Sequence, residues 1–179
     1  VAEASSVSSI IASLSVASKI TGTVTGPDGV TPVENVQVSA CSWNGLWWSS
    51  DGYDWTDAGG HYEIGGLLAG TYRVRFYDAS GHNYVDEAYS NAPSLDLGND
   101  IALPSAATVS NIDASLDEYG SLTGVVVLAD GITPAAGVEV RLIGTVNGVN
   151  RYTDTDVNGQ YYFTSVRPGS YAVRTEPTA

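Results

Sequence analysis

"ITGTVTGPDGVTPVENVQVSA", residues 20–40, decides the fold of this chain, because its pattern returns 102 positions later as "LTGVVVLADGITPAAGVEVRL", residues 122–142. Over the longer segments 7–38 and 109–140, 15 of the 32 aligned positions are identical. Self-similarity at a fixed long period predicts tandem units of one fold. The chain is therefore expected to contain two copies of the same domain.

The second half of each copy continues the repeat at a shorter offset. "TDAGGHYEIGGLLAGTYRVR" (56–75) matches "TDVNGQYYFTSVRPGSYAVR" (155–174) at a shift of 99. The change from 102 to 99 means that the first copy carries three extra residues between Val38 and Thr56. The matched segments predict a domain over 19–118 and a second domain over 119–179.

Both copies have the pattern of short β-strands separated by turns. Val36, Val38 and Ala40 alternate with polar residues, which puts one face of a strand on a core and the other in water. The last strand of the first copy alternates in the same way at Tyr72, Val74 and Phe76. Residues 57–60 and 156–159 favour turns, because Gly and Asn tolerate positive φ. Short strands with turn residues at close spacing indicate β-sandwiches.

At these residues the chain resembles a known family. The pattern "ITGTVTGPDGVTPVENVQVSA…TDAGGHYEIGGLLAGTYRVRF" is similar to carboxypeptidase regulatory-like domains and, more loosely, to Cna-B-type pilin and adhesin domains. The resemblance implies an all-β chain of two tandem immunoglobulin-like or transthyretin-like β-sandwiches. It also implies a stalk, spacer or binding module of secreted and surface proteins, hence an extracellular or cell-surface location, and it brings no active site.

Composition excludes several classes of function. There are 20 Asp and Glu residues against 7 Lys and Arg, and the formal net charge of -13 disfavours nucleic acid as a partner. No apolar run approaches the roughly 20 residues that cross a bilayer, so membrane insertion is not expected. The chain has two histidines and no zinc-ligand motif such as H-x-x-E, so we expect no enzyme activity and no catalytic residue.

"DTDVNGQ", residues 154–160, resembles the opening of a calcium loop. Asp154, Asp156 and Asn158 stand at alternate positions, as in loops that bind calcium through oxygen atoms. The twelfth position, which takes a bidentate Glu in the helical version, is Ser165 here. An ordinary β-turn is the favoured interpretation, calcium is the alternative, and no other cofactor is expected.

The segment "CSWNGLWWSSDGYDW", residues 41–55, is unusual because the second copy has no tryptophan in the same region. It holds all four tryptophans of the chain, Trp43, Trp47, Trp48 and Trp55. They are expected to pack under a longer loop or to lie at an interface with a neighbour. The alternative is a sugar-stacking platform, with Asp51 and Asp54 as hydrogen-bond acceptors, and polysaccharide is then a partner.

The segment "VSNIDASL", residues 109–116, precedes the second domain and is expected to be the closing strand of the first. Its apolar residues at period two, Ile112, Ala114 and Leu116, would point into the core. Almost the same segment, "VSSIIASL", occurs at 7–14. The second copy has no counterpart of residues 76–118 within this sequence.

These observations predict that residues 1–18 form a donor-type strand segment, which adds to the second domain of the next subunit. The predicted subunit interface consists of Val7, Ile10, Ile11, Ala12 and Leu14. The protein would then be a structural subunit of an extracellular filament or surface layer, with itself as partner in a homopolymer. The alternative is a carbohydrate-binding or spacer module of a larger secreted multi-repeat protein.

Overall fold

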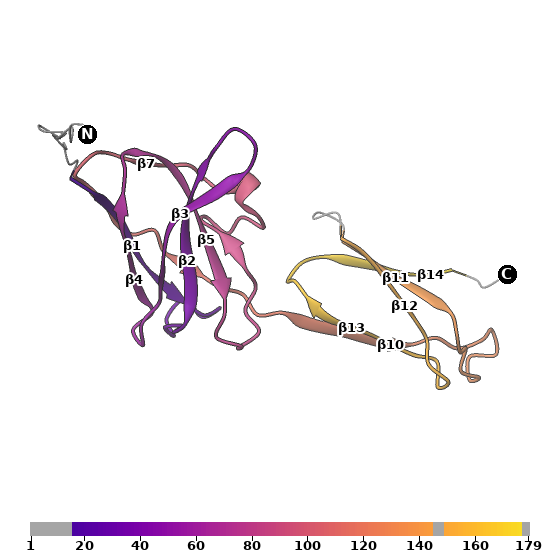
Figure 1. Cartoon of the computed structure of the whole chain (residues 1–179). Coiled ribbons are helices and arrows are strands. Elements are labelled where there is room, and N and C mark those ends of the chain that lie inside the picture. The colour runs from indigo at the N-terminus through magenta and orange to yellow at the C-terminus, as the bar shows by residue number, and fades with distance from the viewer. Residues whose placement is uncertain (1–15, 145–148, 177–179) are drawn as a thin grey trace, which may run out of the picture.

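The computed structural model describes residues 16–144 and 149–176, and it is all-β apart from one short 3-10 helix, η1 (Leu95–Leu97). The all-β prediction is confirmed. Two β-sheet units follow one another along the chain, one over residues 18–116 and one over 120–176, and they are called here the first and the second unit (Figure 1). A short link at 117–119 joins them.

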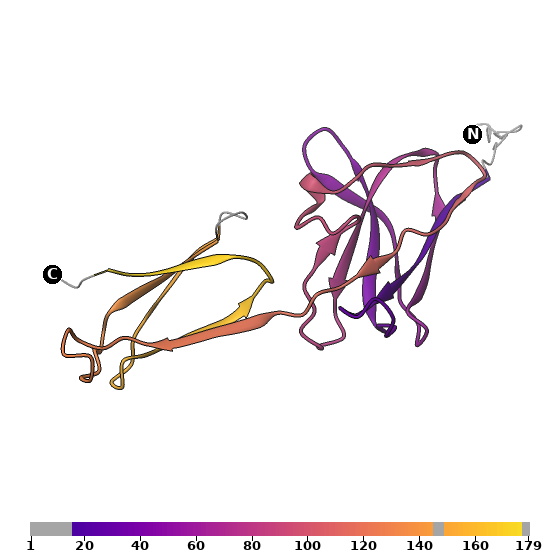
Figure 2. The same cartoon turned by 180° about the vertical axis from the view of Figure 1, so that it is seen from behind.

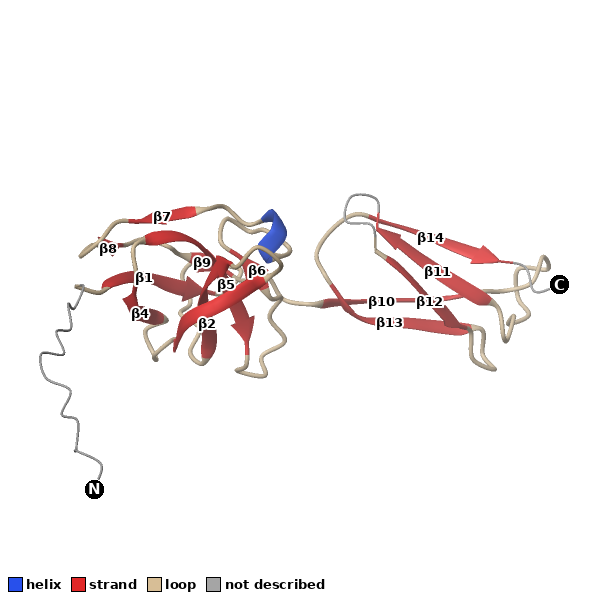
Figure 3. Ribbon diagram, turned by 45° about the horizontal axis from the view of Figure 1, so that its top comes forward, coloured by secondary structure: helices blue, strands red, loops and turns tan. Residues whose placement is uncertain are grey.

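The first unit is a sandwich of two sheets (Figure 3). Its strands are β1 (Ser18–Thr25), β2 (Val36–Trp43), β3 (Trp48–Trp55), β4 (His61–Leu67), β5 (Gly70–Asp78), β6 (Glu87–Ala88), β7 (Ile101–Leu103), β8 (Thr108–Val109) and β9 (Ala114–Ser115). One sheet has the order β4-β1-β8, with β9 also paired to β1. The other has the order β3-β2-β5-β6, with β7 also paired to β5.

The core of the first unit lies between these sheets and follows the alternation in the sequence. The predicted inward residues Val36, Val38 and Ala40 of β2 are fully buried. The inward residues of β5 are buried as well, at Tyr72, Val74 and Phe76. Period-two burial on both facing strands fills the space between the sheets with apolar side chains, which is the main stabilising term of such a sandwich.

The turns of the repeat are built by aspartates that bind backbone N–H groups. Asp28 accepts hydrogen bonds from the N–H groups of Val30 and Thr31 at 2.9 and 2.8 Å, and from the Thr31 hydroxyl at 2.6 Å. These bonds, first of all that of the Thr31 hydroxyl, lower the pKa of Asp28 to about 2. Asp130 makes the same backbone bonds in the second unit.

The second unit repeats the first five strands. They are β10 (Gly120–Val125), β11 (Glu139–Gly144), β12 (Asn150–Asp154), β13 (Gln160–Val166) and β14 (Tyr171–Glu176). The strand β10 pairs with β13, and the second sheet has the order β12-β11-β14. The described residues contain no counterpart of β6 to β9 in this unit. Its buried core is correspondingly small and consists of Val140, Leu142, Phe163 and Val166.

The tryptophan segment is a β-hairpin and not the expected longer loop. β2 and β3 pair antiparallel from Gln37 opposite Trp55 to Trp43 opposite Trp48, with an irregularity between Ala40 and Cys41. Residues 44–47 form the turn at its tip. Cross-strand hydrogen bonding thus extends through a sequence rich in Ser, Asp and Gly, which has low strand propensity. Cys41 is buried.

Candidate functional site

The open edge of β10 is the candidate site, and the first unit shows how an edge of this kind is covered. Residues 108–116 run parallel to β1, with Thr108 opposite Lys19 and Ala114 opposite Val24. Figure 2 shows this segment, in the orange part of the colour range, beside the indigo β1. The segment therefore closes the edge of β1 that β4 leaves free.

Backbone hydrogen bonds hold the closing segment in register. The N–H of Ile112 donates to the carbonyl of Thr21 at 3.2 Å, and the N–H of Leu116 donates to the carbonyl of Thr25 at 2.8 Å. The side chains expected to point inward are buried, namely Ile112, Ala114 and Leu116. That prediction is confirmed. The outward Asp113 accepts a hydrogen bond from the N–H of Thr23 at 2.8 Å.

Gly22 lets the closing segment lie directly against β1. A Cβ atom at this position would overlap the backbone carbonyl of Ile112. The same carbonyl accepts a hydrogen bond from the hydroxyl of Tyr62, at 2.5 Å, on the neighbouring strand β4. Burial raises the pKa of Tyr62 above its ordinary range, so the phenol remains a proton donor. Gly22 thus leaves room for the carbonyl of Ile112, and Tyr62 binds that carbonyl.

In the second unit no strand formed by the described residues lies on the corresponding edge. Within 16–144 and 149–176, β10 pairs with β13 on one side and with no strand on the other. Ile20 and Val24 of β1 are fully buried, whereas their counterparts Leu122 and Val126 are only half-buried. Val125 on the same strand is 57% exposed. An uncovered edge with apolar flanks is a natural site for an added strand.

The predicted donor residues lie outside the described residues. Val7, Ile10, Ile11, Ala12 and Leu14 all belong to 1–15, so the structure does not show where the donor segment lies. The acceptor edge, in contrast, is described along its whole length.

The four tryptophans separate into two places. Trp43 and Trp48 form an edge-to-face pair with ring centroids 5.5 Å apart, and the guanidinium of Arg73 lies 4.4 Å from the ring centroid of Trp48. The indole N–H of Trp48 donates to Asp96 at 3.0 Å. Trp47 is exposed at the hairpin tip. Only Trp48 of these three packs locally, against Trp43, Arg73 and the segment that carries η1, while Trp43 and Trp47 remain exposed.

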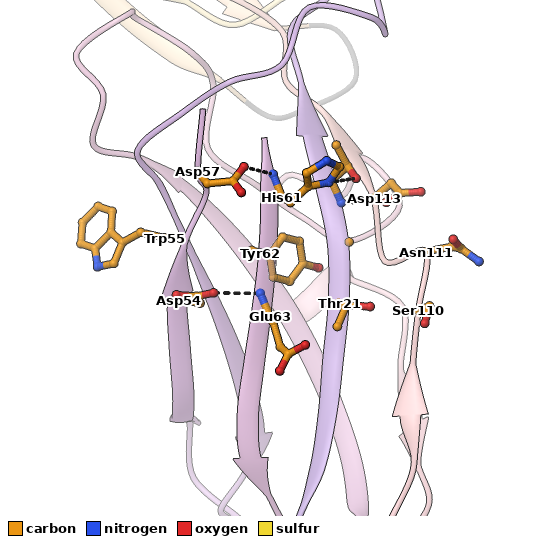
Figure 4. A pocket seen from close by; sticks show the side chains of 12 residues that line it. Thr21, Asp54, Trp55, Asp57, His61, Tyr62, Glu63, Ser110, Asn111 and Asp113 are labelled. Carbon is orange, nitrogen blue, oxygen red and sulfur yellow. Dashed lines mark hydrogen bonds between the residues drawn. The ribbon is translucent and has the colours of Figure 1, made fainter. Parts of the chain in front are cut away.

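Trp55 instead lies beside a shallow groove of about 480 Å³ on the outer face of the sheet that contains β1 and β4 (Figure 4). The charged and aromatic side chains of its lining are Asp54, Trp55, Asp57, His61, Tyr62, Glu63 and Asp113. The carboxylates already have partners within the protein: Asp113 accepts from the N–H of Thr23, and Glu63 pairs with Lys19 at 2.8 Å. Asp54 accepts from the N–H of Glu63 at 2.8 Å, and Asp57 from that of His61 at 2.9 Å. These partners within the protein account for the acidic side chains of the groove, so their presence does not call for a ligand. The backbone hydrogen bonds from His61 and Gly59 also lower the pKa of Asp57.

The sequence did not predict this groove, because Asp113 and Thr23 are brought together by the fold across 90 positions. The signal that could have found it is the alternation itself. Along β1, β4 and the closing segment, the residues that alternate with the buried ones point outward. They must therefore lie together on the outer face of this sheet.

The calcium candidates lie in and beside a turn. Asp156 accepts hydrogen bonds from the N–H groups of Asn158 and Gln160, each at 2.8 Å. Asp57 of the first unit makes the equivalent bonds. Asp154 lies at the end of β12, where its backbone pairs with Glu139. Among the described residues no three His, Cys, Asp or Glu side chains form a group that could hold a metal ion.

Comparisons with known proteins agree with the sandwich fold. Residues 120–178 match the family described as "BOS complex subunit NOMO1-like, second beta sandwich domain". The bone sialoprotein-binding protein of Staphylococcus aureus is 32% identical over 142 residues, which cover 69% of this chain and 12% of that protein. A solved streptococcal ancillary pilin superposes with a TM-score of 0.53 at 14% identity, covering 89% of this chain and 53% of the pilin.

The chain thus spans about 12% of the length of the curated relatives it matches. The family match supports a β-sandwich for the second unit and does not single out the carboxypeptidase regulatory-like or the Cna-B type. The expectation of an extracellular, cell-surface protein agrees with these relatives. In the described part of the chain, no helix has the length and apolar character needed to span a bilayer.

Proposed function

We propose that this chain is a structural subunit of an extracellular filament or surface layer. In this proposal residues 7–14 of one copy add as a strand to the β10 edge of the next copy. One observation carries it: the segment 109–116, nearly identical in sequence to 7–14, covers the equivalent edge of β1 in the first unit.

The repeat offset sets the register of the proposed contact. Positions 7–14 precede 109–116 by the same 102 residues that separate β1 from β10. The N–H of Ile10 would therefore donate to the carbonyl of Thr123, as that of Ile112 does to Thr21. Ile10 and Leu14 would cover the half-buried core residues of the second unit.

The expected energy of this contact is moderate. Burial of Ile10 and Leu14 contributes about 3–6 kcal/mol, and each net backbone hydrogen bond adds about 0.5–1.5 kcal/mol. Bringing two separate molecules together costs about 4 kcal/mol or more. Since the gain exceeds this cost by only a few kcal/mol, assembly should depend strongly on protein concentration.

The direction of the contact determines the shape of the assembly. The donor segment precedes the first unit, and the acceptor edge lies in the second unit. A contact between two different surfaces repeats head to tail and gives an open filament unless its rotation closes a ring. The role is structural, and it uses backbone pairing and apolar burial.

The test compares two sets of changes in the donor segment. Ile10→Asp with Leu14→Asp places charges at the inward positions and should abolish assembly. Ser8→Asp with Ser9→Asp is the matched control, because both residues lie outside the predicted interface and their counterparts in the first unit, Ser110 and Asn111, are exposed. Assembly is followed by sedimentation velocity and negative-stain electron microscopy over a range of concentrations. If the double variant still forms filaments with the same repeat as the unaltered protein, the proposal is wrong.

The alternative function is a spacer or carbohydrate-binding module of a larger secreted protein. A polypeptide that remains monomeric at high concentration favours this alternative. The observation that supports a sugar site is Trp55, which is 44% exposed beside the groove. Tryptophan fluorescence is titrated with a panel of soluble polysaccharides, and Trp55→Ala should remove the response while Trp47→Ala keeps it. A flat titration with the unaltered protein counts against sugar binding.

A further inference from the structure

Two tyrosines at equivalent positions differ in how they face the strand edge. Tyr62 lies opposite Gly22 in the pairing of β1 with β4, and Tyr161 lies opposite Gly124 in the pairing of β10 with β13. Tyr62 is 4% exposed and donates its hydroxyl hydrogen to the carbonyl of Ile112. Tyr161 is half-buried, and its hydroxyl has no hydrogen-bond partner among the described residues.

Different groups occupy the space beside the equivalent glycines, Gly22 and Gly124, in the two units. At Gly22 an added Cβ would overlap the backbone carbonyl of Ile112. At Gly124 it would overlap the hydroxyl and ring of Tyr161. In the second unit the tyrosine therefore covers the glycine at the place that the carbonyl of the closing strand takes in the first.

A change in the facing sheet accounts for the different position of the ring. Tyr62 packs edge-to-face on Phe76 of β5, with ring centroids 6.1 Å apart. The counterpart of Phe76 at a shift of 99 is Thr175, which is exposed. Tyr161 instead packs edge-to-face on Phe163 of its own strand, at 6.0 Å. The position across the core that holds an aromatic ring in the first unit thus holds a threonine here, and the ring of Tyr161 lies over the open edge.

We propose that Tyr161 is the gate of the acceptor edge: it covers Gly124 while the edge is empty and turns to donate its hydroxyl to the carbonyl of Ile10 when the donor strand arrives. This inference rests on the proposed function and names the residue that recognises the strand. Gly124 is needed in both states, because a side chain there would fill the space taken by the ring of Tyr161 in the empty edge and by the carbonyl of Ile10 in the complex.

The gate is tested with the full chain carrying Ile10→Asp and Leu14→Asp, which keeps its own donor segment off the edge. The probe is a fluorescein-labelled peptide of residues 7–14, and its dissociation constant is measured by fluorescence polarisation. Tyr161→Phe removes only the hydroxyl and should weaken binding about 3- to 10-fold, the value of one neutral hydrogen bond. Gly124→Ala should abolish binding, and thermal melting checks that both variants fold.

A second probe separates a direct hydrogen bond from a general effect on the edge. In this peptide the carbonyl of Ile10 is replaced by a thioamide, a weaker hydrogen-bond acceptor, and a thioamide at Ser9 is the control. Compared with the unmodified peptide, the Ile10 thioamide peptide should bind more weakly to the protein that retains Tyr161. The two peptides should bind equally well to the Tyr161→Phe variant. Equal binding of the unmodified peptide to both proteins would overturn the gate while strand addition stands. A peptide that fails to bind the protein with Tyr161 would overturn both.

Discussion

The hydroxyl of Thr56 donates a hydrogen bond to the carbonyl oxygen of Val33 at 2.7 Å, and both groups are buried. The same hydroxyl accepts a hydrogen bond from the N–H of Val36 at 2.9 Å. One side chain thus satisfies both backbone groups where the chain enters β2. Thr155 makes the same two bonds in the second unit.

Replacing Thr56 by valine keeps the shape of the side chain and removes both hydrogen bonds. Because a buried carbonyl and a buried N–H then lose their partner, the free energy of unfolding should fall by about 1–3 kcal/mol. Urea denaturation followed by circular dichroism measures the change. Thr56→Ser, which retains the hydroxyl, is the control and should lose much less. A valine variant as stable as the unaltered protein would contradict the assignment.

Gly22→Ala should loosen the closing segment of the first unit. The added methyl overlaps the carbonyl of Ile112, and relief of the overlap must shift a backbone, at a cost of about 1–3 kcal/mol. Hydrogen exchange should speed up at the N–H groups of Ile112 and Leu116, which bind β1. Gly65→Ala on the adjacent β4 is the control, because a Cβ there meets open space. Equal exchange rates in both variants would refute the close approach.

Glu87 gives the first unit a predictable pH dependence. Burial first, and the nearby charge of Asp117 second, raise the pKa of Glu87 to about 7 from 4.5, while Arg167 opposes the shift. One of its oxygens is buried without a hydrogen-bond partner in the described part of the chain. A carboxyl whose pKa is raised by folding binds more protons in the folded state. Its stabilising contribution is therefore complete below about pH 4.5 and is lost as the pH rises through 7.

Glu87→Gln removes this titration, so the comparison of the two proteins isolates it from the other acids. The glutamine variant should gain stability relative to the unaltered protein as the pH rises from 4.5 to 8. Urea midpoints measured at intervals across this range provide the check. A difference in stability that stays constant with pH would show that Glu87 does not titrate there.

Cys41 should react slowly in the folded protein. Burial raises the pKa of its thiol to about 11, so little thiolate exists at pH 8, and the sulfur is also shielded from solvent. Labelling by a thiol-reactive dye should be about 100-fold slower than in urea. Ser50, which lies opposite Cys41 and is exposed, provides the comparison as Ser50→Cys in a Cys41→Ser background. Rapid labelling of native Cys41 would contradict its packing.

Local patterns in the sequence determined the elements of this protein. The alternation at Val36, Val38 and Ala40, and the turn residues at 57–60 and 156–159, predicted strands, turns and core. They succeed because side-chain direction along a strand and the φ preference of glycine are properties of neighbouring residues. The internal repeat extended the same predictions to the second unit. It also singled out 7–14 and 109–116 as equivalent segments.

Only the tertiary structure decided how the edges are covered. β6 to β9 are two or three residues long, too short for a periodic pattern, and β7, β8 and β9 pair with strands that are not their neighbours in the sequence. The strand β3 forms in a sequence of low strand propensity because β2 supplies its hydrogen bonds. Tyr62 contacts Phe76 across the core, whereas Tyr161 contacts Phe163 of its own strand and the counterpart of Phe76 is the exposed Thr175. Such contacts are long-range and cooperative, so no local window of the sequence contains the energy that selects them.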